Sequence, residues 1–97
     1  MSATAQGNFV IVRCVYAGVH IGYVDSIDGQ RVALTDARRL WRWRGANTLH
    51  EASKRGVDEV YSRISEPVAY VELLDAIEVI PCESAAVDNL TRSRWPA

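Results

Sequence analysis

The stretch that decides the fold reads IGYVDSIDGQRVALT, from Ile21 to Thr35. Two apolar-rich runs, residues 21–27 and 30–35, flank the dipeptide Asp28-Gly29. Asp and Gly both tolerate the positive φ of a type I′ turn, and this pair between two such runs is the strongest short-range signal for a β-hairpin. The sequence therefore predicts two antiparallel strands joined at Asp28-Gly29.

Further strands are expected on both sides of this hairpin. Residues 9–16 are rich in Val and also contain Phe, Ile and Tyr, which is the composition of a buried strand. Residues 68–74 and 76–80 are two apolar runs separated by Asp75, and Pro81 ends the second. Each run is predicted to be a strand, although the first could instead be partly helical.

Two short helices complete the expected elements. The first begins with a capping-box pattern, in which the hydroxyl of Thr48 accepts from the amide of Glu51 while the Glu51 carboxylate reaches back. Gly56 ends this helix, and Ser84 is the expected cap of a second helix over residues 85–90. Because the connections between the early strands are too short for parallel crossovers, we predict an α+β fold: a small twisted, mostly antiparallel β-sheet with two short helices.

Length and composition predict a single domain over residues 1–97, with flexible tails at 1–8 and 92–97. The chain has no run of 18 apolar residues, and its first residues lack the basic and apolar regions of a secretion signal. We therefore expect no membrane association and a cytoplasmic location. Cys14 and Cys82, each within an apolar run, are predicted to be buried thiols.

The most unusual segment is RRLWRWR, residues 38–44, which holds four of the eleven basic side chains and two of the three tryptophans. We predict a separate strand here, entered through Asp36-Ala37 and ended by Gly45. Side chains alternate along a strand. One face would then carry Arg39, Trp41 and Trp43, and the other Arg38, Leu40, Arg42 and Arg44.

This composition suits a nucleotide-like anion, because indoles stack on flat rings and guanidinium groups hold phosphate oxygens two at a time. It equally suits a protein interface, where Trp and Arg are favoured anchors. Trp41 and Trp43 could also simply fill the core beneath a helix, and the sequence leaves this choice open.

Residues 45–48 lie between the basic segment and the predicted first helix. Their amides, Asn47 and Thr48 could form an anion site at the helix N-terminus together with Arg42 and Arg44. The alternative is a tight turn and an ordinary cap. His50, in the first turn, is expected to face solvent.

Charge is unevenly distributed along the chain. Residues 1–56 carry eight basic and four acidic side chains, whereas residues 57–90 carry eight acids and only Arg63. Such polarity favours a homo-oligomer in which the basic half of one copy meets the acidic half of another. With a net charge of −1, nucleic acid is an unlikely partner, because duplex binding normally needs a broad basic face.

Catalytic and metal motifs are not found in the sequence. There is no nucleophile elbow and no phosphate-binding lysine loop, and Lys54 is the only lysine. His20 and His50 lie far apart and near no C-x-x-C pattern. We predict a protein that is not an enzyme and that uses no metal and no cofactor.

An ordered set of residues across positions 9–90 resembles a family of small phage and prophage proteins described as having a domain of unknown function. The resemblance rests on the core Ala37-Arg38-Arg39-Leu40-Trp41-x-Trp43-x-Gly45-Ala46, with Asp28-Gly29 before it and Asp75-Ala76-Ile77-Glu78 and Pro81-Cys82 after it. It implies a phage origin and the host cytoplasm as the location. Small phage proteins without catalytic motifs are often counter-defence factors.

Two mechanisms compete within this resemblance. In the first, an oligomer sequesters a nucleotide-derived immune signal, a cyclic ADP-ribose isomer or a cyclic oligonucleotide, without cleaving it. Trp41 or Trp43 would stack the base and Asn47 would contact a ribose hydroxyl or a base edge, with Arg38, Arg39, Arg42 and Arg44 on the phosphates. In the second, the protein blocks a host defence protein by direct binding. We prefer the first, because paired indoles beside clustered guanidiniums suit a small anionic ring better than a flat surface.

Overall fold

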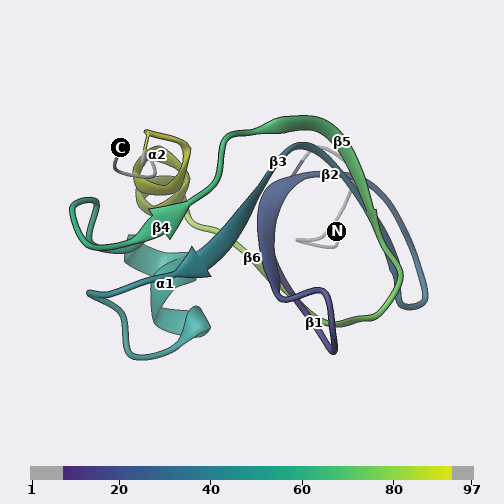
Figure 1. The fold of residues 1–97 in the computed structure, drawn as a ribbon, viewed down its shortest axis with the longest axis horizontal. Coiled ribbons are helices and arrows are strands. Elements are labelled where there is room, and N and C mark those ends of the chain that lie inside the picture. Colours follow the sequence, from purple (N-terminus) through teal and green to yellow (C-terminus); the bar gives the residue numbers. More distant parts are fainter. Residues whose placement is uncertain (1–7, 93–97) are drawn as a thin grey trace.

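The computed structural model describes residues 8–92 and confirms the predicted α+β class (Figure 1). Its elements in chain order are β1 (Phe9–Cys14), β2 (Val19–Asp28), β3 (Arg31–Arg42), α1 (Leu49–Arg55), β4 (Arg63–Ile64), β5 (Val68–Leu73), β6 (Ala76–Pro81) and α2 (Ser84–Arg92). Every strand pairing among them is antiparallel. Of the predicted tails, residues 1–7 and 93–97 lie outside the described part of the chain, whereas Arg92 ends α2.

The predicted hairpin is confirmed as β2 and β3, but its turn is one residue further along. Asp28 pairs with Arg31, so the two central residues are Gly29 and Gln30. Within the described residues, Gly29 has a positive φ of 59° and neither Asp28 nor Gln30 does, so the turn differs from the predicted type I′. The first apolar run of the second half is a strand, β5, and not a helix.

The sheet curls on itself. β5 and β6 follow one another across a short turn, yet β5 pairs with β3 and β6 pairs with β1, which lie on opposite sides of β2. Figure 1 shows the strands wrapping around a common interior, with both helices and β4 to one side of this curl. We call the wrapped strands the curl.

Two hydrophobic cores follow from alternation along β1. Phe9 and Ile11 face the helices, where they pack with residues such as Leu40 and Leu90. Val10 and Val12, one position out of phase, face the inside of the curl. Because β1 is covered on both sides, it reads as the nearly continuous apolar run seen in the sequence.

The predicted cap and end of the first helix are confirmed, whereas Ser84, the predicted cap of the second, is instead the first residue of α2. The Thr48 hydroxyl accepts from the amide of Glu51 at 3.2 Å, and Gly56 ends α1 with φ 82°. The second half of the capping box differs from the prediction, since the Glu51 carboxylate accepts from the side chain of Asn47 at 3.4 Å and pairs with Arg55. Neither described helix is long and apolar enough to cross a membrane.

Two side chains tie distant segments together. The Asn89 amide on α2 donates to the carbonyl of Val57 and accepts from its amide, both at 2.8 Å, which fixes the chain after α1. The Asp75 carboxylate accepts from the amides of Tyr16 and Ala17 at 2.6 and 3.2 Å. The Tyr16 amide is the main cause that lowers the pKa of Asp75.

Candidate functional site

The basic segment is not a separate strand, because β3 continues through it with a bulge. Between the pairs Tyr23–Thr35 and Ile21–Arg38, β3 uses one residue more than β2, and Asp36 takes a positive φ of 48°. An extra residue reverses which side of the sheet the following side chains face. Arg38 is therefore turned toward the helices, and Arg39 toward the open end of the curl.

A second irregularity in β3 divides the tryptophans. Leu40 pairs with Ile64 and Arg42 with Arg63, so two residues of β3 oppose one residue of β4. Trp41 and Arg42 both face outward as a result, and the alternation restarts beyond them. Trp43 then packs against the core beneath the helices, whereas Trp41 is 54% exposed. The sequence predicts one common face for Arg39, Trp41 and Trp43, and this prediction is wrong for Trp43.

Arg38 is used inside the protein. It is only 8% exposed, and its guanidinium donates to the carbonyls of Ser65 at 2.7 Å, Leu90 at 2.9 Å and Thr91 at 3.1 Å. The last two carbonyls belong to the final turn of α2, where helix carbonyls lack partners within the helix and positive charge is favourable. The predicted role of Arg38 in holding a ligand phosphate does not fit this placement.

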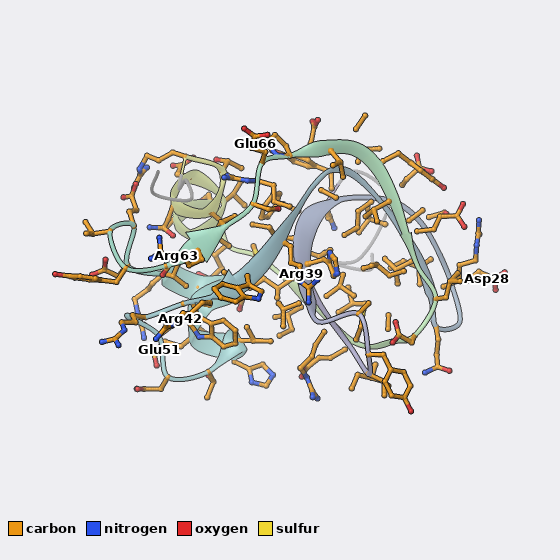
Figure 2. The ribbon with its side chains drawn as sticks, viewed as in Figure 1. Asp28, Arg39, Arg42, Glu51, Arg63 and Glu66 are labelled. Carbon is orange, nitrogen blue, oxygen red and sulfur yellow. The ribbon has the colours of Figure 1, made fainter. Side chains whose placement is uncertain are left out.

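The other arginines of the segment lie on the surface. We define the arginine face as Arg39, Trp41, Arg42, Arg44 and the neighbouring Arg63 of β4. In Figure 2, Arg42 and Arg63 lie together near the end of β3, and Arg39 lies further back along the strand, over β2. Because Trp41 stands between Arg39 and Arg42 in sequence, an aromatic ring separates two cationic positions.

Ion pairing distinguishes Arg39, Arg42 and Arg44 from the exposed arginines outside the face in residues 8–92. Four arginines outside it are each paired with a carboxylate: Arg13 with Glu78, Arg31 with Glu72, Arg55 with Glu51 and Arg92 with Glu59. Within residues 8–92, by contrast, no acceptor bonds to the guanidiniums of Arg39, Arg42 or Arg44. These three cations are available to an external anion.

The same pairs bear on the predicted self-association. Three of the eight acids in residues 57–90, namely Glu59, Glu72 and Glu78, already have arginine partners in the same chain. A second copy is therefore not needed to neutralise them. The homo-oligomer stays a prediction, but its electrostatic basis is weaker than the sequence indicates.

A shallow cleft lies beside Arg39 at the open end of the curl. Its lining includes His20, Ala37, Arg39 and Val71, and its volume is about 190 Å³. This is below the roughly 300–1,000 Å³ of typical ligand pockets. A Cβ on Gly18 would lie 2.9 Å from the Arg39 guanidinium, so the glycine makes room for that side chain.

His20 is a residue of the cleft that sequence reasoning does not select. Its Nε2 lies 2.8 Å from the carbonyl oxygen of Ala17, and it pairs with Arg39 across the β2–β3 ladder. Burial is the main cause that lowers the pKa of His20. The ring is therefore neutral at pH 7 and adds no charge to Arg39. Their proximity follows only from the register of β2 and β3, which the bulge alters, so the sequence alone does not reveal that His20 lies beside Arg39.

The predicted anion site at the start of α1 is filled by the protein itself. Glu51 places a carboxylate there, bonded to the Asn47 side chain, and the Thr48 hydroxyl is used on the Glu51 amide. A helix of seven residues also has little dipole to offer. His50 is 72% exposed, as expected, with its Nε2 3.3 Å from Glu78. The structure thus shows Asn47 and Thr48 in the cap of α1, and their contact with a phosphate stays a prediction.

A comparison with protein families matches residues 7–90 to a family described as a domain of unknown function, DUF6948. The chain belongs to the DUF6948 family. Searches of the curated proteins and of the solved structures find no significant match. Every residue of the arginine face lies within the span matched to DUF6948, and the family description assigns no activity to the domain.

The DUF6948 domain of this chain also holds two free thiols, of which Cys14 is buried as predicted and Cys82 is only partly buried. Burial is the main cause that raises the pKa of Cys14 to about 11 and that of Cys82 to about 12. Within the described residues, no group of three His, Cys, Asp or Glu side chains is placed to hold a metal ion.

These pKa values predict that both thiols react slowly in the folded protein. At pH 8 each would be protonated, so a disulfide reagent should release little chromophore until denaturant is added. For each thiol the pKa in the folded protein exceeds that in the unfolded chain. The buried protonated thiols therefore contribute to the free energy of unfolding at neutral pH, and this contribution is lost as pH rises through about 9 to 12. Rapid release of two equivalents from the native protein at pH 8 would contradict this placement.

Proposed function

We propose that this protein is a non-enzymatic binding protein that holds a nucleotide-derived anion on the arginine face. The observation that carries the proposal is a contrast in pairing within residues 8–92. The four exposed arginines outside the face are held by carboxylates, whereas Arg39, Arg42 and Arg44 have no acceptor there. Like charges this close in sequence repel one another unless an anion joins them. Phosphate groups would fill this need, and the half-exposed Trp41 would stack a base.

In the biological role that we propose, the protein is a phage counter-defence factor. It sequesters a nucleotide-derived immune signal, a cyclic ADP-ribose isomer or a cyclic oligonucleotide, and releases it unchanged. The site residues of this proposal are Arg39, Trp41, Arg42 and Arg44, with Arg63 added from β4. Arg38, Trp43, Asn47 and Thr48 become supporting residues, because their side chains contact the protein itself.

The direct test is a calorimetric titration of purified protein with cyclic nucleotides and ADP-ribose isomers. Mass spectrometry of the solution after heat denaturation should then recover the bound molecule with its mass unchanged. Recovery of a hydrolysed product would indicate an enzyme. Absence of heat with every nucleotide, together with no nucleotide released from the purified protein, would overturn the proposal.

Substitution of the face should separate binding from folding. Arg39→Ala, Arg42→Ala and Arg44→Ala remove exposed side chains that have no acceptor in the described part of the chain, so each should change stability by no more than about 0.5 kcal/mol. Loss of one charge-assisted phosphate contact should weaken binding by about 1.5–3 kcal/mol. Arg13→Ala is the matched control, because Arg13 is an exposed arginine that already has a partner, Glu78. Equal weakening by Arg13→Ala would show that only net charge matters.

One observation favours a second candidate, direct binding to a host defence protein. The arginine face is open, and the turn beside Arg44 exposes Val60 and Tyr61 at 69% and 65%. Exposed Trp, Tyr and Arg side chains are typical anchors of protein interfaces. Val60→Ser and Tyr61→Ser distinguish the candidates, since they should weaken a protein complex strongly and leave nucleotide binding nearly unchanged.

A further inference from the structure

We infer that the ligand of the arginine face is an oligonucleotide segment, in which two phosphodiester groups flank a nucleoside. A mononucleotide or a pyrophosphate such as ADP-ribose fits the face less well. This inference rests on the proposed function and selects one ligand class within it. The segment could belong to a linear single strand or to a cyclic oligonucleotide, which present the same chemistry.

The first argument is the separation of the free cations. Arg39 and Arg42 are three residues apart on an extended strand, which corresponds to about 10 Å between their Cα atoms. The Arg39 guanidinium lies against Gly18 of the loop between β1 and β2, whereas Arg42 is paired with Arg63 on β4. Figure 2 shows Arg39 apart from this second pair along β3. As placed in the structure, the two arginines therefore offer two separate positions for phosphates.

The second argument is the position of Trp41. It follows Arg39 by two residues on the same outward side, and the bulge places Arg42 directly beyond it. A ring stacked on Trp41 therefore lies between the two cationic positions. In an oligonucleotide the base and its sugar also lie between two phosphates, so the order of groups on the ligand matches the order of side chains on β3. In a pyrophosphate such as ADP-ribose both phosphates lie on the same side of the adenosine, so the order of its groups matches the face less well.

The third argument is the openness of the face. The cleft of about 190 Å³ beside Arg39 is too small to enclose a nucleotide, which would remain exposed on one side. Single-stranded nucleic acids are bound in this open manner, by cations that follow the backbone and aromatic rings that stack bases. A net charge of −1 argues against a broad duplex-binding surface, but a few unpaired arginines suffice for two phosphates.

The test is fluorescence anisotropy with a labelled single-stranded 12-mer, competed by unlabelled ligands. The competitors are a linear dinucleotide with a 5′-phosphate, a cyclic diadenylate, AMP, ADP-ribose and an abasic 12-mer. The wild-type protein, Arg39→Ala, Arg42→Ala, the double variant and the Arg13→Ala control are measured at several salt concentrations. Direct calorimetry with AMP and ADP-ribose detects binding that does not displace the 12-mer.

We expect the dinucleotide or the cyclic diadenylate to compete at least tenfold better than AMP and ADP-ribose. Arg39→Ala and Arg42→Ala should each weaken the 12-mer about tenfold or more, and the double variant should combine both losses. Each loss should also reduce the salt slope by about 0.7, the value for one phosphate of a single strand. The abasic 12-mer should bind more weakly, because it cannot stack on Trp41. The better of the two competitors identifies the linear or the cyclic source.

Three results would overturn the inference. If AMP or ADP-ribose binds as tightly as the dinucleotide, the proposed function stands but the ligand class is wrong. If the abasic 12-mer binds as well as the normal one, the face recognises polyanions in general, which include acidic proteins. If no nucleotide of any kind binds, the proposed function and this inference are both wrong.

Discussion

Gly56→Ala is expected to lower the free energy of unfolding by about 3–5 kcal/mol. Gly56 has φ 82° and ψ −159°, a region that is nearly restricted to glycine and costs other residues about 1–3 kcal/mol. A Cβ at this position would also lie 2.1–2.5 Å from three atoms of the Asn89 side chain. Asn89 is not free to move, because it is buried and holds both backbone groups of Val57. Overpacking of this kind costs a further 1–3 kcal/mol or so.

Gly29→Ala is the matched control for this prediction. Gly29 also has a positive φ, 59°, but a Cβ there would have no atom of the described residues within 4 Å. Gly29→Ala should therefore lower the free energy of unfolding only by the cost of the backbone conformation, roughly 1 kcal/mol. Urea denaturation of both variants measures the difference. Equal losses would show that Asn89 does not restrict Gly56. A domain of this size is typically stable by about 5–15 kcal/mol, so the Gly56→Ala variant should retain enough folded protein at low temperature for its free energy of unfolding to be measured.

Arg38→Ala is expected to lower the free energy of unfolding by a similar amount, about 3–5 kcal/mol. Three carbonyls accept from its guanidinium, and hydrogen bonds to a charged group contribute about 1.5–3 kcal/mol each before the desolvation cost of the charge is subtracted. Removal would leave the carbonyls of Leu90 and Thr91 without this partner at the end of α2. It would also leave a cavity beside Leu40 and Leu90, which face the same core.

Arg39→Ala provides the comparison, since it removes the same side chain one position further along. Arg39 is exposed and has no acceptor in the described chain, so its loss should cost no more than about 0.5 kcal/mol. Arg38→Lys should recover only part of the stability, because one ammonium group does not reproduce the guanidinium fork. Similar thermal midpoints for Arg38→Ala and Arg39→Ala would show that the buried contacts of Arg38 contribute little.

Local signals in the sequence were sufficient for most elements of the fold. The hairpin between β2 and β3, the cap at Thr48, the end of α1 at Gly56 and the break between β5 and β6 are all confirmed. Each depends on residues within a few positions of one another, so the physical cause is visible in the sequence. The α+β class follows from the same short connections.

The candidate site was predicted less well, because it depends on the register of β3. Alternation alone assigns Arg38 to the same side as Arg42, and Trp41 to the same side as Trp43. The structure separates the members of both pairs through one extra residue near Trp41, and a second extra residue near Asp36 turns Arg38, and not Arg39, toward the helices. No residue type marks these positions reliably, since Asp at a positive φ is uncommon and Trp is not typical of bulges.

The sequence by itself therefore determined that this chain forms an antiparallel sheet with two helices, and it singled out residues 38–44 as the segment in which basic side chains are concentrated. Only the tertiary structure decided which of these arginines are free. Arg38 meets the end of α2, which is more than 50 residues away, and the acids of the second half meet Arg13 and Arg31 across the sheet. The physical reason is that pairing and burial of a charge depend on long-range neighbours, whereas turns and caps depend on adjacent residues.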